Sequence, residues 1–174
     1  MPYAAEILPS YTGRMSRPRR LEGFSCVGCY RYFLTTCTYK RRQTFLDHAI
    51  ATQTIEQFRT TSRDEGFSLL AYCVMPDHVH ALLEGLTDES DFRRCTKMAK
   101  QRSGAAYALT SETPLWQKGY YEHVLRDEED SKEIAFYIIA NPVRAGLVQS
   151  PDDYPFSGSD AWTIRELIEW VTKA

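Results

Sequence analysis

Two adjacent strand-like runs constrain the fold of this chain more than any other feature. The first run, FSLLAYCVM at 67–75, is largely apolar, and the second, HVHALLEG at 78–85, follows directly after a Met-Pro-Asp corner. Pro and Asp are typical of tight turns, and short apolar runs bounded by such turns are typical of strands. The two runs therefore predict a β-hairpin at the centre of the chain.

Helical and strand patterns alternate on both sides of this hairpin. An aromatic and β-branched run predicts a strand at 29–40. A helix is predicted at 44–66, with an apolar face formed by Phe45, Ala49, Ile50, Ile55 and Phe58. Further along, the patterns predict a helix at 91–109 capped by Asp88 or Ser90, a strand at 115–127 and a helix at 128–146. The order β-α-β-β-α-β predicts an α+β fold, a ferredoxin-like split βαβ sandwich with an antiparallel sheet and additional C-terminal helices.

The length of 174 residues suits one domain with short extensions. Residues 1–23, rich in Arg, Pro and Gly, predict a basic irregular N-terminal arm, and residues 24–149 predict the domain itself. Residues 150–174 predict a C-terminal loop and an amphipathic helix at 161–173, packed on the domain or extending it. The apolar face of that helix would suit dimerisation, DNA contact or covering of the core.

Composition and charge narrow the class of protein. No apolar run approaches the roughly 20 residues of a membrane helix, and the first residues lack the order of a signal peptide, so we predict a cytoplasmic protein without membrane contact. The formal net charge is −2, yet residues 1–42 hold eight Lys and Arg against two acids. This asymmetry predicts either a basic binding face or a solubilising tail on an acidic body.

Two of the four histidines, His78 and His80, are one residue apart in the predicted return strand. Alternation along a strand places both on one face, roughly 7 Å apart, while Val79, Ala81 and Leu83 point to the opposite face, which we expect to be the core side. Two imidazoles at this spacing can bind one metal ion or one phosphate. The alternative is that they only pack against each other.

A second pair of polar residues lies in the predicted helix at 128–146. Tyr137 and Asn141 are four residues apart, so they share one helical face, one turn from each other. Taken singly, Tyr137 could be a core aromatic and Asn141 could mark the end of the helix before Pro142. Cys26 and Cys29 form a lone Cys-x-x-Cys pair without a matching second pair, which does not support a zinc site.

The motifs taken together resemble a known family. YCVMPDHVHALLEG, LWQKGYYEHVLRD, YIIANPVRAGLV and DYPFSGS occur in this order, and the resemblance spans about residues 20–156. The chain resembles the single-tyrosine HUH transposases, which are IS200-like, and among them the REP-associated tyrosine transposases.

The resemblance implies a metal-dependent endonuclease and strand transferase that acts on single-stranded or hairpin DNA. It implies that His78, His80 and Asn141 bind Mg²⁺ or Mn²⁺, and that Tyr137 attacks the phosphodiester to form a 5′-phosphotyrosine. Asp77 and His123 are candidates to hydrogen-bond to these metal ligands and so orient them. Relatives include monomers and homodimers, so the sequence leaves the oligomeric state open.

Two further predictions concern DNA. The candidates for contact with the DNA backbone are Arg17, Arg19, Arg20, Lys40, Arg41, Arg42, Lys118 and Arg144.

The alternative function is a domesticated, catalytically silent module that binds hairpin nucleic acid. A small-molecule metalloenzyme would leave Tyr137 and Asn141 unexplained, and a pure binding module has no need of the complete set.

Overall fold

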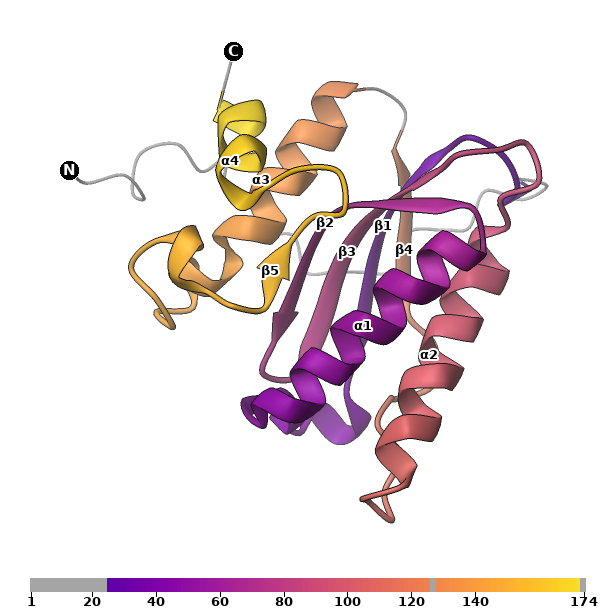
Figure 1. The fold of residues 1–174 in the computed structure, drawn as a ribbon, viewed down its shortest axis with the longest axis vertical. Helices are drawn as coiled ribbons and strands as arrows, with labels where there is room; N and C mark the ends of the chain where they lie inside the picture. Colours follow the sequence, from indigo (N-terminus) through magenta and orange to yellow (C-terminus); the bar gives the residue numbers. More distant parts are fainter. Residues whose placement is uncertain (1–24, 126–127, 173–174) are drawn as a thin grey trace.

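The computed structural model describes residues 25–125 and 128–172. Within these residues, five strands form one open antiparallel sheet in the order β4-β1-β3-β2-β5 (Figure 1). Their bounds are β1 Arg31–Cys37, β2 Phe67–Met75, β3 His78–Gly85, β4 Tyr121–Leu125 and β5 Ser157–Gly158. The predicted hairpin is β2 and β3, whose pairing begins at Met75 opposite His78.

Four α-helices cover the two faces of this sheet in the described part of the chain. They are α1 His48–Asp64, α2 Phe92–Ala108, α3 Glu128–Arg144 and α4 Ile164–Thr172. Figure 1 shows α1 and α2 side by side on one face and α3 with α4 on the other. The order β-α-β-β-α-β with the central strands β1 and β3 confirms the predicted ferredoxin-like α+β class, to which α3, β5 and α4 are added.

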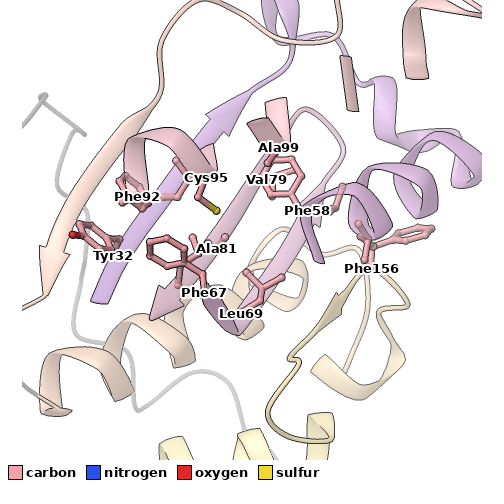
Figure 2. Close-up of a cluster of buried hydrophobic side chains, with 14 of the residues drawn as sticks. Tyr32, Phe58, Phe67, Leu69, Val79, Ala81, Phe92, Cys95, Ala99 and Phe156 are labelled. Atoms are coloured by element: carbon pink, nitrogen blue, oxygen red, sulfur yellow. The ribbon is translucent and has the colours of Figure 1, made fainter. Parts of the chain in front are cut away.

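The first hydrophobic core lies between the sheet and the pair α1 and α2. The ring of Tyr32 on β1 stacks on the ring of Phe92 at the start of α2, with centroids 4.1 Å apart. Figure 2 shows this cluster, in which Phe92, Cys95 and Ala99 of α2 face strand residues that include Ala81. Val79, Ala81 and Leu83 all belong to this core, as the alternation of β3 predicts.

The two helix starts differ from the prediction. Helix α1 begins at His48, where Asp47 accepts hydrogen bonds from the amides of Ala49 and Ile50. Phe45 therefore lies in a preceding 3₁₀ turn, and Ala49 is exposed. Ile55 and Phe58 are buried as predicted, and Ala51, Thr54, Thr61 and Ser62 complete the buried face of α1. Because Asp47 caps the helix, α1 begins one turn later than the apolar pattern suggested.

Helix α2 is capped by Asp91, not by Asp88 or Ser90. The side chain of Asp91 accepts a hydrogen bond of 3.0 Å from the amide of Arg94. Ser90 has another task, because its hydroxyl donates to the carbonyl of Gly66 over 2.7 Å. That bond ties the start of α2 to the end of α1.

The second core lies on the face that carries the histidines, and this corrects the expectation of a single core side. Phe33 and Leu82 on this face are 1% and 0% exposed and pack with Ile138 and Ile139 of α3. Leu167 of α4 is fully buried in the same cluster. Helix α4 therefore covers a core, which is one of the three roles that its apolar face allowed. Dimerisation and DNA contact by α4 stay predictions.

Of the predictions from composition, the structure bears on the absence of a membrane helix but not on the N-terminal arm. In the described ranges no helix is both long enough and apolar enough to span a membrane. The predicted basic arm at 1–23 lies outside the described residues.

Candidate active site

The two histidines stand at the start of β3, in the middle of the sheet. His80 lies directly opposite Thr35 of β1 and Cys73 of β2, and His78 lies opposite Cys37 of β1. The two Nε2 atoms approach to 3.0 Å. The rings therefore share one face of the sheet and point toward each other, with His80 almost fully buried.

Each histidine is also held through its other ring nitrogen. Nδ1 of His78 lies 2.6 Å from a carboxylate oxygen of Asp77, and Nδ1 of His80 lies 2.8 Å from the hydroxyl of Thr35. The second carboxylate oxygen of Asp77 makes an ion pair of 2.9 Å with Arg41. Such contacts fix which nitrogen of an imidazole is presented to a ligand. Asp77 therefore contacts His78, the histidine that it was predicted to support.

The turn that carries Arg41 has an unusual backbone. Lys40 and Arg41 both have positive φ angles, of 54° and 56°, which residues other than glycine seldom adopt. This turn directs the guanidinium of Arg41 back toward the sheet, where it contacts Asp77 and donates to Sγ of Cys37 over 2.7 Å. The basic side chain therefore stands at the edge of the histidine pair.

Helix α3 brings Tyr137 and Asn141 over the same face. The ring centroid of Tyr137 lies 5.5 Å from that of His80 and 6.0 Å from that of Phe33. One turn later, the amide nitrogen of Asn141 donates to the carbonyl of Tyr137 over 3.0 Å, so its amide oxygen is the atom that could bind a metal ion. The helix continues through Pro142 to Arg144, and Asn141 does not mark its end.

These residues line one open cleft with a volume of about 460 Å³. Its wall is formed by Thr35, Cys37, Arg41, His78, His80, Gln117, Lys118, Tyr120, Tyr121, Tyr137 and Asn141. The four residues that the sequence assigned to catalysis and metal binding, Tyr137, His78, His80 and Asn141, thus come together within a single chain. The cleft is polar and aromatic, with two basic side chains in its wall.

Sequence reasoning missed several members of this wall. Thr35, Cys37 and Tyr121 face the cleft because β1 pairs with both β3 and β4. Once this pairing is known, alternation along the strands places all three side chains on the face of the histidines. Gln117 and Tyr120 lie in the irregular segment before β4, where no periodic signal exists. His123 is exposed on the same face, opposite Phe33, and is outside the cleft wall among the described residues.

Residues 26–141 match the model of a protein family described as "Transposase IS200 like". This chain belongs to the IS200-like transposase family. It is 32% identical over 111 residues to the REP-associated tyrosine transposase of Escherichia coli strain K12, covering 63% of this chain and 66% of that protein. A Haemophilus influenzae protein assigned to the same group is 27% identical over 146 residues, which cover 72% and 77% of the two chains.

A solved structure supports the same relationship at the level of the fold. It is the structure of a REP-associated tyrosine transposase bound to a REP hairpin, with a TM-score of 0.66 and 26% identity. The match covers 82% of this chain and 82% of that one. The resemblance to IS200-like, REP-associated tyrosine transposases that the motifs indicated is therefore confirmed.

The donor atoms of this IS200-like transposase fit a divalent ion with open coordination positions. In the described parts of the chain, no group of three His, Cys, Asp or Glu side chains is placed to bind a metal ion. Two imidazoles and the amide oxygen of Asn141 would instead form a three-ligand set in the cleft wall. Imidazole and oxygen ligands together suit Mn²⁺ well and Mg²⁺ less well, and three ligands leave room for phosphate oxygens.

The predicted DNA-contacting residues are distributed unevenly around the cleft of the transposase. Arg41 and Lys118 line it, and the guanidinium of Arg144 lies 5.2 Å from the ring centroid of Tyr137. Lys40 and Arg42 lie over the ring of Tyr39, outside the cleft wall. The arginines of the N-terminal arm lie outside the described residues: Arg17, Arg19 and Arg20.

Burial keeps both imidazoles neutral, which is the form that binds metal. Burial lowers the pKa of His80 well below its ordinary value of 6.5, and the nearby His78, Arg41 and Arg144 lower it further. Burial also lowers the pKa of His78, although its hydrogen bond to Asp77 opposes the shift. Protons therefore compete less with a metal ion here than at exposed histidines.

The lowered pKa values predict how stability depends on pH. The unfolded chain binds protons on these histidines near pH 6.5 while the folded chain does not, so stability is full above that pH and declines below it. Each histidine contributes at most about 1.4 kcal/mol per pH unit to this decline. Urea unfolding between about pH 7.5 and pH 5.5 measures the slope, which should be shallower in His80→Gln. An unchanged slope in that variant would contradict the assignment.

Proposed function

We propose that this protein is a metal-dependent endonuclease and strand transferase of single-stranded DNA, with Tyr137 as the nucleophile and hairpin DNA as the substrate. One observation carries the proposal: Tyr137 and the histidine pair His78 and His80 line one cleft of a single chain, and the ring centroids of Tyr137 and His80 are 5.5 Å apart. Membership of the IS200-like family and the hairpin-bound relative support the choice of substrate.

In the proposed step, the phenolic oxygen of Tyr137 bonds to the phosphorus of the scissile phosphodiester, and the bond from phosphorus to the 3′ oxygen breaks. The phenol releases its proton to water, and the departing 3′ oxygen takes up a proton to become a hydroxyl. The product is a 5′-phosphotyrosine that retains the bond energy for rejoining, so no ATP is consumed. A Mg²⁺ or Mn²⁺ ion held by His78, His80 and Asn141 would withdraw charge from the phosphate.

The residues around Tyr137 suit the positioning of a DNA strand. The Tyr137 ring contacts Phe33 of β1, His80 of β3 and Arg144 of its own helix, and these contacts limit the directions that its oxygen can take. Holding a nucleophile in line with the phosphorus supplies a large part of such a rate enhancement. Tyr120 and Tyr121 in the cleft wall offer ring faces for unpaired bases, and Lys118 offers charge for a phosphate.

The experiment that tests the proposal scores covalent protein–DNA adducts on a denaturing gel. The full chain is incubated with single-stranded hairpin oligonucleotides drawn from the repeats flanking its gene, in Mn²⁺, in Mg²⁺ and in EDTA. We expect adducts with either metal and none in EDTA. Tight hairpin binding without an adduct in any metal would instead establish the catalytically silent binding module.

A further inference from the structure

Thr35 holds the one ring nitrogen of His80 that does not face His78. It is 5% exposed, lies directly across β1 and β3 from His80, and its hydroxyl is 2.8 Å from Nδ1. The proposed step uses His80 as a ligand and assigns no task to this hydroxyl.

The hydrogen bonds on the two histidines determine where their protons lie. The carboxylate of Asp77 can only accept, so Nδ1 of His78 carries the proton and Nε2 of His78 presents a lone pair. Across the 3.0 Å contact, Nε2 of His80 must then be the donor. His80 therefore presents a lone pair at Nδ1, and the hydroxyl of Thr35 donates to it.

A metal ion requires a different arrangement on His80 alone. Both Nε2 atoms must present lone pairs to the ion, so the proton of His80 must move from Nε2 to Nδ1, while His78 already has the required tautomer. The hydroxyl of Thr35 must then accept where it previously donated. A hydroxyl can do both by rotating about its C–O bond, whereas a methyl group can do neither.

We propose that Thr35 is a positioning residue that lets His80 exchange between a tautomer bonded to His78 and a tautomer that binds metal. This inference rests on the proposed metal-dependent function. Thr35 also determines the ring orientation, because a half-turn of the imidazole would place a carbon against the hydroxyl and lose the bond. The rings of Phe33 and Tyr137, each 5.5 Å from His80, hold the ring plane but do not distinguish its two edges.

The strand offers a matched control at the next residue. Thr36 is fully buried on the opposite face of β1, opposite Val79, and its hydroxyl has no hydrogen-bond partner among the described residues. Thr35→Val and Thr36→Val make the same chemical change one residue apart in the same strand. Thr35→Ser keeps the hydroxyl and removes only a methyl group.

Mn²⁺ binding to the full chain, titrated by the electron paramagnetic resonance of the free ion, tests the proposal without DNA. We expect Thr35→Val to weaken binding roughly 10- to 100-fold, the effect typical of a lost hydrogen bond to a metal-bound histidine. Thr36→Val and Thr35→Ser should bind close to the wild type. Wild-type affinity in Thr35→Val, or an equal loss in Thr36→Val, would overturn the proposal.

A second measurement separates this inference from the proposed function. In metal-free protein, ¹⁵N spectra of the imidazoles report which nitrogen carries the proton. We expect a proton on Nε2 of His80 in the wild type and in Thr36→Val, and a mixture of tautomers or ring orientations in Thr35→Val. Identical His80 spectra in the wild type and Thr35→Val would overturn the role of Thr35 even if metal binds. A wild type that binds no Mn²⁺ would overturn the metal-dependent function instead.

Discussion

Replacing Tyr137 with phenylalanine is expected to abolish the covalent protein–DNA adduct, with a loss of roughly 10⁴-fold or more, because no other group supplies the attacking oxygen. Phenylalanine keeps the ring that packs edge-on against Phe33 and His80, so the cleft should retain its shape. Hairpin binding should therefore stay close to the wild type while the adduct disappears. A denaturing gel measures the adduct, and a filter-binding or anisotropy titration measures the DNA affinity.

The control for this change is Tyr121→Phe, which removes a phenolic oxygen from the same cleft but from β4 instead of α3. It should retain the adduct and alter only affinity. If adducts persist in Tyr137→Phe and vanish in Tyr121→Phe, the nucleophile is Tyr121 and not Tyr137.

Replacing Leu167 with alanine is expected to lower the free energy of unfolding by about 3–4 kcal/mol, as for other fully buried leucines. Leu167 is 0% exposed and joins α4 to the core that supports α3. For a chain of this size, such a loss lowers the Tm by roughly 6–16 °C. Thermal and urea unfolding of the full chain, followed by circular dichroism, measure both quantities.

Arg165→Ala on the exposed face of α4 is the matched control, and it should change stability by less than about 0.5 kcal/mol. The loss in Leu167→Ala should appear as a shift of one cooperative transition, because α4 and α3 share the cluster behind Tyr137. A variant with wild-type stability would show that α4 is a detachable extension and not part of the folded unit.

Local patterns in the sequence were sufficient for the order of the elements and for the pairs of functional residues. Alternation along a strand depends only on backbone geometry, so His78 and His80 had to share a face. Helical periodicity likewise had to place Asn141 one turn from Tyr137. Neither pattern could bring the two pairs together, and the meeting of β3 with α3 was expected only from the family resemblance.

The cap residues show where local patterns are weakest. Asp88, Ser90 and Asp91 are all side chains that can cap a helix, and their order in the sequence does not distinguish them. Asp91 caps α2, while the hydroxyl of Ser90 donates to Gly66 at the end of α1. The Ser90 bond joins elements that are distant along the chain, so no local pattern could reveal it.

The tertiary structure alone decided what surrounds the histidines. Thr35 is 45 residues from His80 and Arg41 is 36 residues from Asp77, the residues that they contact, and strand pairing and a left-handed turn brought them there. The second core arose in the same way, because α3 and α4 cover the face of the sheet that carries the histidines. The sequence determined which side chains could act as ligands and nucleophile, since that is a property of residue type and local spacing. Register and packing between distant segments decided which nitrogen of each histidine faces the cleft, because those contacts cannot form until the chain has folded.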